Sequence, residues 1–462
     1  MSSNPFLYSR RSFLNHGMQL LSAAATLPMF LDRSARALAA DFAANPQGSG
    51  RPDNILVIVQ MAGGNDGLNT VVPVRNDDYY KARPTLSIPQ KQTLRATDDF
   101  GFHPSATGFK KMWDDGQLAV LHSVGYPNHN RSHFRSTDIW QTAEPVKVAK
   151  SGWLGRYFDA CCSGEDPGSQ PKAAEPSAAI ALTAEPPTTL IGEKFIPLAF
   201  RSPAELTYAE STGNDRLKSA FERLNSDIGL HDPINDADHM APGGTIHIPR
   251  GAERPMAAAD SAVHADDFLQ RSALNARVYA DRIKGSIAAV HNKVAYPASP
   301  FADELKIVAQ MIAAGLPARV YYVQIGGFDT HSNQAQRHVK LLGDLSGGLA
   351  AFVDDLKSLG HLDRTTVVTF SEFGRRVKEN GSGTDHGEAA PLFVMGSAIK
   401  PGFHGADPEL RPDKLSRGDV PFAQDFRSVY ATMLAQWLRA DDAKVLGQSF
   451  PRLDLFQPAR VG

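Results

Sequence analysis

Short apolar runs alternate with amphipathic segments along most of the chain. The runs are rich in β-branched and aromatic residues, which is typical of buried strands, and they cover residues 55–59, 118–124, 320–325, 365–370 and 390–395. Helical periodicity is found between and around them, at residues 104–113, 152–157, 205–228, 266–291, 301–314 and 339–359. No internal repeat is visible. The alternation of strand and helix predicts an α/β fold built on a parallel sheet.

Two stretches interrupt this alternation. Residues 164–176 and 231–257 are rich in Pro, Gly, Ala and Asp, which is typical of flexible boundaries. We therefore expect an insertion, a cap region, over about residues 164–265. Residues 40–53 are rich in Ala, Asn, Gly and Pro and are predicted to be a linker. Residues 54–462 are then the α/β domain.

The first residues have the pattern of an export signal. Arg10 and Arg11 precede a short, weakly apolar segment and a small-x-small motif that ends at Ala39. This order indicates a twin-arginine signal peptide over residues 1–39, cleaved after Ala39. The alternative is an amphipathic helix that stays on the protein. We expect a periplasmic or secreted protein that uses the twin-arginine translocase during export.

Composition excludes several classes of protein. The formal net charge is −2, from 48 basic and 50 acidic residues, so no overall charge favours nucleic acid as a partner. Cys161 and Cys162 are adjacent and are the two cysteines of the chain, which excludes a disulfide scaffold and a cysteine-rich zinc site. No later segment has about 18 consecutive apolar residues, so no membrane span is expected in the mature protein.

Acidic and histidine residues lie next to the predicted strands. Asp66 follows the first run, Asp329 and His331 follow residues 320–325, Glu372 follows residues 365–370, and His386 precedes residues 390–395. In open α/β sheets, ligands bind beyond the carboxyl ends of the strands, so these side chains are expected to converge. Carboxylates together with imidazoles bind divalent metals: zinc or manganese, with calcium and magnesium as further candidates. A metal-dependent hydrolase is the leading hypothesis.

Each of these motifs has a simpler interpretation. Asp329 is also placed to cap a helix, with His331 hydrogen-bonded in its first turn. Glu372 with Arg375 and Arg376 is also compatible with a surface ion pair, and His386 with a solvated turn.

A serine beside basic residues is the candidate nucleophile. Ser132 lies between Arg131 and His133, and a nearby divalent ion would lower the pKa of its hydroxyl. The alternative role is a helix N-cap. Arg135 and Arg375 are candidate ligands for the non-bridging oxygens of an anionic substrate.

Five motifs together carry a family resemblance. They are Gly63–Gly67, Tyr126–Ser136, Gly326–His331, Ser371–Arg375 and Asp385–Gly387. Over about residues 54–438 the chain resembles the domain-of-unknown-function family 1501, exported proteins that are similar to the alkaline phosphatase and sulfatase superfamily. The resemblance implies a three-layer α/β sandwich with a mostly parallel central sheet and an inserted cap region.

The resemblance also implies roles for single residues. Asp66 matches the metal-binding aspartate after the first strand, and Ser132 stands where the nucleophile is expected. Asp329 and His331 match the first metal site, with Asp-x-His in place of Asp-x-x-x-His, and His386 matches the late histidine. Glu372-Phe373-Gly374 stands in place of Asp-His-Gly, so Phe373 removes one ligand of a second metal site. No Cys/Ser-x-Pro-x-Arg motif surrounds Ser132, so sulfatase formylglycine chemistry is not expected.

Two functions follow as expectations. The first is an exported metal-dependent hydrolase of phosphate or sulfate esters, acting on a small-molecule or polymer substrate through Ser132. The second is an exported binding or assembly protein that keeps the fold with a degraded metal site. A serine esterase is weaker, because no Gly-x-Ser-x-Gly motif surrounds Ser132.

Overall fold

The computed structural model describes residues 54–161, 176–203 and 283–458. All of them belong to one compact unit of the chain, Asn45–Pro203 with Ile283–Gly462. The predicted signal peptide and linker lie outside the described residues. No helix among the described residues is both long enough and apolar enough to cross a bilayer.

The described part of the chain alternates strands and helices as the hydrophobic pattern predicts. The strands are β1 (Ile55–Ala62), β2 (Val71–Pro73), β3 (Leu94–Arg95), β4 (Phe100–Phe102), β5 (Leu118–Gly125), β6 (Ala179–Ala181), β7 (Leu198–Ala199), β8 (Val320–Gly326), β9 (Thr365–Phe370), β10 (Ala390–Met395), β11 (Gly402–His404) and β12 (Gln424–Asp425). The α-helices are α2 (Gly67–Thr70), α3 (Asp77–Ala82), α4 (Thr107–Asp114), α5 (His133–Thr142), α6 (Trp153–Cys161), α9 (Pro300–Ala313), α10 (Gln334–Ser358), α11 (Phe426–Thr432) and α12 (Asp442–Leu446).

The described strands form one large sheet and one small one. The large sheet has the order β11-β5-β10-β9-β1-β8-β6-β7, with β12 also paired to β5. β1 is parallel to both β8 and β9. β10 is antiparallel to both β9 and β5, so β5 runs in the same direction as β1. The sheet is therefore mostly parallel, as predicted, and β9 and β10 lie between β1 and β5. The small sheet has the order β2-β4-β3.

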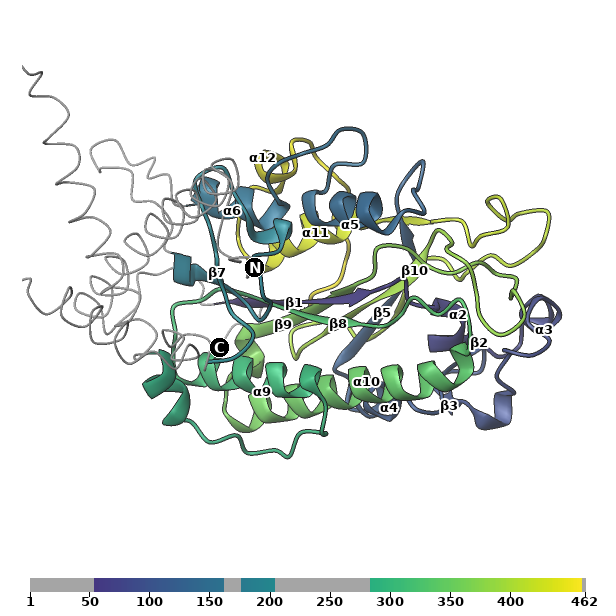
Figure 1. The fold of residues 1–462 in the computed structure, drawn as a ribbon, viewed down its shortest axis with the longest axis horizontal. Helices are drawn as coiled ribbons and strands as arrows, with labels where there is room; N and C mark the ends of the chain where they lie inside the picture. Colours follow the sequence, from purple (N-terminus) through teal and green to yellow (C-terminus); the bar gives the residue numbers. More distant parts are fainter. Residues whose placement is uncertain (1–53, 162–175, 204–282, 459–462) are drawn as a thin grey trace, which may run out of the picture. The chain divides into compact units, whose positions relative to one another are not determined.

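Helices cover both faces of the large sheet (Figure 1). α4, α9 and α10 lie on one face, and α5, α6, α11 and α12 on the other. Because both faces are covered, the central strands are apolar throughout: Ile55 to Met61 of β1 are all buried. The predicted three-layer α/β architecture is confirmed.

Local sequence explains where the helices begin. α9 starts at Pro300 after Ser299, whose hydroxyl accepts a hydrogen bond from the Ala302 amide, an N-cap followed by proline at the first helical position. α10 starts at Gln334, five residues before the helix expected at 339, because Asn333 at φ 51° ends the preceding loop in the left-handed region.

Part of the predicted insertion belongs to the sheet. Within residues 164–265, residues 176–203 contribute β6 and β7, and β6 pairs in parallel with β8. The rest of that range lies outside the described residues, as do the helix expected at 205–228 and most of the one expected at 266–291.

Candidate metal centre

Loops from distant parts of the sequence meet at one edge of the large sheet. β1, β8 and β9 are parallel and end there, whereas the antiparallel β10 begins there. Residues 63–66, 327–331, 371–376 and 384–389 are therefore brought together. This is the edge at which ligands bind in open α/β sheets.

Gly63 lets two of these loops touch. It has φ 119°, and a Cβ built on it would lie 2.3 Å from the Asp329 backbone nitrogen. The Gly63 amide also donates a hydrogen bond of 2.8 Å to Oε1 of Glu372. Only glycine combines this backbone conformation with so close an approach.

Three side-chain atoms lie at the corners of a nearly equilateral triangle. Nε2 of His331 is 3.0 Å from Nε2 of His386, and Oδ1 of Asp329 is 3.1 Å from each of these nitrogens. Ligand atoms about 2.1 Å from one ion lie roughly 3.0 Å apart in octahedral geometry and roughly 3.4 Å apart in tetrahedral geometry. The triangle therefore has the dimensions of one face of a coordination shell.

The other ring nitrogens of both histidines already have partners. Nδ1 of His386 lies 2.8 Å from the Arg131 carbonyl oxygen, which only accepts hydrogen bonds. Nδ1 of His331 lies 3.1 Å from Oδ1 of Asp385, and hydrogen bonds from Asn380 and His331 lower the pKa of that carboxyl. Each Nδ1 is therefore assigned as the donor, and this tautomer directs the Nε2 atom of each ring into the triangle as the ligand atom. Burial also lowers the pKa of His386, which favours its neutral form.

A third imidazole, His133 at the start of α5, completes the arrangement. Its Nδ1 is 2.8 Å from Oε1 of Glu372. Its Nε2 lies 3.5 Å from Oδ2 of Asp329 and makes no hydrogen bond with any described residue. His133, Asp329 and His386 can together surround one ion. We call Asp329, His331, His386 and His133 the Asp329 cluster. His133 belongs to the Tyr126–Ser136 motif, but it is not among the metal ligands predicted from the sequence.

The donors of the Asp329 cluster fit a divalent metal. Asp329 and His386, with either His331 or His133, supply two imidazole nitrogens and a carboxylate, a ligand set that zinc or manganese accepts, whereas calcium and magnesium prefer all-oxygen shells.

Arg375 holds Asp329 from behind. Its guanidinium is completely buried and donates to the carbonyl oxygens of Gly63, Gly64, Thr384 and Phe328 and, at 2.8 Å, to Oδ1 of Asp329. Burial raises the pKa of Asp329, but the hydrogen bonds from Arg375 and His386 and the positive charge of Arg375 together outweigh burial and hold this pKa far below its usual range. The structure thus places Arg375 as a brace of the loops, with its donors already in use.

Glu372 lies behind the Asp329 cluster as well. It is buried, and one oxygen, Oε1, accepts from both Gly63 and His133. It orients a ligand in the way that carboxylates behind metal-bound histidines commonly do.

Asp66 lies deeper in the molecule. Its side chain is fully buried, pairs with Arg83 at 2.6 Å and accepts a hydrogen bond from Gln334. Gln334 in turn accepts hydrogen bonds from Thr330 and Thr384, the neighbours of Asp329 and Asp385. Asp66 is therefore linked to the Asp329 cluster through Gln334. Among the described residues, the side chains that could together hold an ion at this site do not include Asp66.

Ser132 stands at the edge of the Asp329 cluster. It is exposed and occupies the N-cap position of α5, but its side chain makes no capping bond, and its hydroxyl has no hydrogen-bond partner among the described residues. Its neighbours both contact the cluster, Arg131 through its carbonyl oxygen and His133 through its ring.

Arg135 is occupied elsewhere. Its guanidinium pairs with Asp138 and donates to the carbonyl oxygens of Glu144, Pro145 and Lys147. Arg135 therefore fastens the loop after α5, and both terminal nitrogens of its guanidinium are used in these contacts.

Phe373 forms an apolar wall of the site. Its ring centroid is 4.9 Å from that of His133 and 4.4 Å from that of His386. Phe373 stands at the sequence position where the family resemblance implies a histidine. The third imidazole of the site comes instead from His133, at the start of α5.

A second group of acids and a histidine braces the loop before α5. The His129 ring lies between Glu388, 2.9 Å away, and Asp419, 3.3 Å away. Arg131 also pairs with Asp419, and Arg376 lies 3.4 Å from it. Three ligand atoms of this group also lie close enough for an ion. The arginines already balance the carboxylates, so we interpret it as an ion-pair network.

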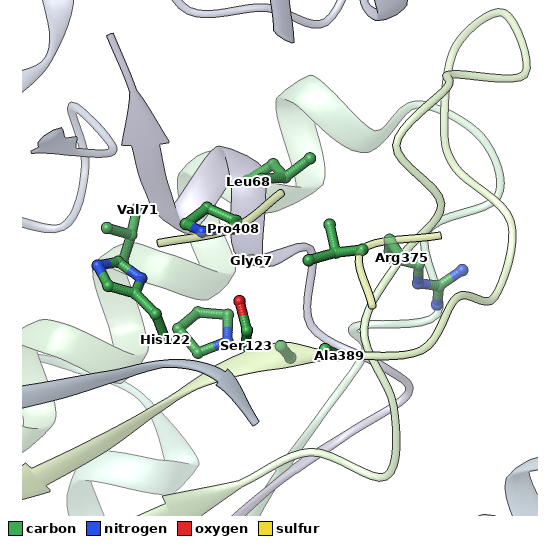
Figure 2. Close-up of a pocket in the computed structure, with 11 residues that line it drawn as sticks. Gly67, Leu68, Val71, His122, Ser123, Arg375, Ala389 and Pro408 are labelled. Atoms are coloured by element: carbon green, nitrogen blue, oxygen red, sulfur yellow. The ribbon is translucent and has the colours of Figure 1, made fainter. Parts of the chain in front are cut away.

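A small cavity of about 20 Å³ lies at the end of β5 (Figure 2). His122 and Ser123 line it, and Nε2 of His122 and Oγ of Ser123 have no hydrogen-bond partner in the part of the chain that the structure describes. Figure 2 shows the Arg375 guanidinium pointing away from these two residues. The space suffices for about one water molecule, and none of the four residues of the Asp329 cluster lines it.

Comparison with known proteins gives a partial family match. The family model described as "Protein of unknown function (DUF1501)" matches residues 256–447, which confirms the predicted resemblance over that range. It includes Asp329, His331 and His386 and excludes His133. No curated protein matches the chain.

Solved structures that resemble the chain are distant. They include the lipoteichoic acid synthase LtaP from Listeria monocytogenes, at 8% identity, 80% of this chain, 74% of that chain and TM-score 0.30. PsFucS1 sulfatase from Pseudoalteromonas sp. is 11% identical, the match covers 94% of this chain and 79% of the sulfatase chain, and the TM-score is 0.31. A TAB5 alkaline phosphatase mutant with Mg bound is 13% identical, the match covers 75% of this chain and 91% of the phosphatase chain, and the TM-score is 0.27.

Proposed function

We propose that the chain is a metal-dependent hydrolase of phosphate or sulfate esters. The observation that carries the proposal is the Asp329 cluster, in which Asp329, His331 and His386 present three ligand atoms 3.0 to 3.1 Å apart. A divalent ion held there would polarise an ester oxygen and stabilise the negative charge that develops on it. Phosphate and sulfate esters are proposed because the five sequence motifs resemble those of a family that is similar to the alkaline phosphatase and sulfatase superfamily.

The chain's own residues supply the remaining parts. Ser132 offers an exposed hydroxyl with no hydrogen-bond partner among the described residues, at the N-terminus of α5. Backbone amides at a helix N-terminus attract anions, which favours a phosphate or sulfate group beside Ser132. Glu372, Asp385 and the Arg131 carbonyl hold the three imidazoles in one orientation, and Arg375 holds Asp329.

Metal analysis tests the first half of the proposal. Purified protein should contain close to one zinc or manganese ion per chain after supplementation, and His331→Ala and His386→Ala should each lower this occupancy. Chelator treatment should abolish hydrolysis of 4-nitrophenyl phosphate or 4-nitrophenyl sulfate. A protein that binds no ion after supplementation would favour the alternative of an exported binding protein.

Ser132→Ala tests the second half. The variant should keep its metal and lose hydrolysis, because Ser132 is proposed as the attacking group rather than as a ligand. If Ser132→Ala retains full activity, water is the nucleophile and Ser132 has only a structural role.

We also propose that the protein is exported through the twin-arginine translocase, on the basis of Arg10 and Arg11 and the small-x-small motif ending at Ala39. Replacing both arginines with lysine should leave the protein in the cytoplasm. Undiminished export of the double variant in a fractionation assay would contradict this assignment.

A further inference from the structure

A cavity of about 620 Å³ adjoins the candidate metal centre. The link between them is Asp385: it lines the cavity, and its Oδ1 accepts the hydrogen bond from Nδ1 of His331. Arg376, next to Arg375, lines it too. The volume is in the range of pockets that bind small organic molecules.

The cavity has an apolar side. Leu410 and Val377 are buried in a hydrophobic cluster, Leu415 and Ala82 pack against that cluster, and all four line the cavity together with Pro412. Such a surface gains free energy when an apolar body displaces water from it.

The acidic residues of the lining already have partners. Glu379 accepts hydrogen bonds from the amides of Thr85 and Leu86. Asp78 pairs with Lys81 at 3.1 Å, and Asp385 accepts from His331. None of these carboxylates needs a cationic ligand.

The basic residues differ from one another. Lys81 pairs with Asp78, and Arg376 donates to the Arg417 carbonyl oxygen and lies 3.4 Å from Asp419. Lys378 is exposed and has no hydrogen-bond or ion-pair partner among the described residues. The lining therefore offers one cation without a counter-ion beside an apolar surface.

We propose that this cavity binds the organic group of the ester, and that it selects a group with an apolar body and a second negative charge placed against Lys378. The proposal rests on the hydrolase function proposed above, since the Asp329 cluster would act on the ester bond while the cavity holds the rest of the molecule. Asp385 joins the two parts, because it orients His331 from the cavity wall.

Direct binding tests the cavity without metal or turnover. The probe is 8-anilinonaphthalene-1-sulfonate, which has an apolar body, one sulfonate and a fluorescence that rises on binding. Lys378→Ala should raise its Kd about fivefold, the upper range for an exposed ion pair. Lys378→Arg should retain binding, and Leu415→Asp should abolish it while the thermal unfolding curve stays cooperative. Lys357→Ala, which removes an exposed lysine at the end of α10, is the matched control and should leave Kd unchanged.

Two results would overturn the proposal: no binding to the parent protein, or the same Kd in the parent, Lys378→Ala and Leu415→Asp. Either result leaves the metal analysis of the parent protein unaffected.

Kinetics separates the cavity from the hydrolase function. Phenyl phosphate and 4-carboxyphenyl phosphate are compared, and Lys378→Ala should raise KM about fivefold for the carboxylated ester alone, with kcat unchanged. If the parent protein hydrolyses both esters and Lys378→Ala alters neither KM value, the proposed binding role of the cavity is refuted and the hydrolase function is retained. If the parent protein binds no metal and cleaves neither ester, the hydrolase function is refuted. Binding of the fluorescent probe then tests the cavity as a binding site independently of hydrolysis.

Discussion

Glu372 and His133 are 239 residues apart in the sequence, and Oε1 of Glu372 lies 2.8 Å from Nδ1 of His133. The carboxylate belongs to the loop after β9, and the ring to the first turn of α5. Their contact turns Nε2 of His133 towards Asp329, and no described residue forms a hydrogen bond with this nitrogen. The pair therefore makes His133 a candidate ligand, and it makes Glu372 the residue that orients it.

Glu372→Gln should weaken metal binding by about 10- to 100-fold, the usual effect of removing a carboxylate behind a metal-bound histidine. The amide oxygen can still accept from Gly63, so the fold should be retained. Zinc affinity is measured by competition with a chromophoric chelator. Glu409→Gln, which alters a carboxylate paired with Arg411 on an exposed loop, is the control and should leave the affinity unchanged. Equal affinities of Glu372→Gln and parent would show that the Glu372–His133 contact does not support the metal site.

The sheet could be predicted from the sequence because its strands are apolar on both faces. Residues 365–370 and 390–395 form β9 and β10 at the expected positions, and β1 extends the first run to Ala62. The order of the strands could not be predicted, because the antiparallel β10 inserts between β9 and β5 through long-range pairing.

The candidate site was predictable in part. Asp329, His331 and His386 each adjoin a strand, and the common edge of the sheet brings them together, as the pattern indicated. The pattern gave no sign that Asp66 pairs with Arg83 or that Arg375 bonds to four carbonyl oxygens, because both depend on tertiary contacts. His133 was missed for the same reason: its orienting partner follows a strand 239 residues later.

Arg375→Lys should destabilise the protein by about 3 kcal/mol or more. Lysine has one ammonium group and cannot reach four carbonyl oxygens and Asp329 together, so buried acceptors would lose their donors. Urea unfolding measures the loss. Arg376→Lys is the control, because its side chain is only partly buried and has fewer partners. A loss below about 1 kcal/mol for Arg375→Lys would mean that the guanidinium does not brace these loops.

His129→Gln should loosen the loop before α5 and destabilise the protein by about 2 kcal/mol at pH 6. Burial lowers the pKa of His129, but the hydrogen bonds that its ring donates to the carboxylates of Asp419 and Glu388, together with their negative charges, outweigh burial and raise the pKa above 6.5. A raised pKa in the folded state means that this stabilisation is complete below pH 6.5 and is lost as the pH rises through the folded pKa. The gap in unfolding free energy between parent and variant should therefore shrink from pH 6 to pH 9. A gap that is the same at both pH values would show that the His129 charge plays no part.

His338→Met should make the protein less sensitive to acid. His338 is fully buried on α10, and neither ring nitrogen has a hydrogen-bond partner among residues 54–161, 176–203 and 283–458. Burial lowers its pKa from 6.5 to about 4. Between these values the unfolded chain takes up a proton that the folded protein excludes, so the parent loses stability as the pH falls from 6.5 towards 4. Methionine has a similar size and no proton to bind, which removes this loss.

The comparison of urea unfolding at pH 7.5 and pH 5 measures the effect. At pH 5, linkage for a pKa change from 6.5 to about 4 amounts to on the order of 2 kcal/mol, and the variant should gain this much relative to the parent between the two pH values. His103 and His122, whose pKa values burial also lowers to about 4, remain in both proteins, so both should still lose stability in acid. The difference between the two proteins therefore isolates His338. If that difference is the same at pH 7.5 and pH 5, His338 is protonated in the folded protein, and its unpartnered nitrogens must then have an acceptor in solution.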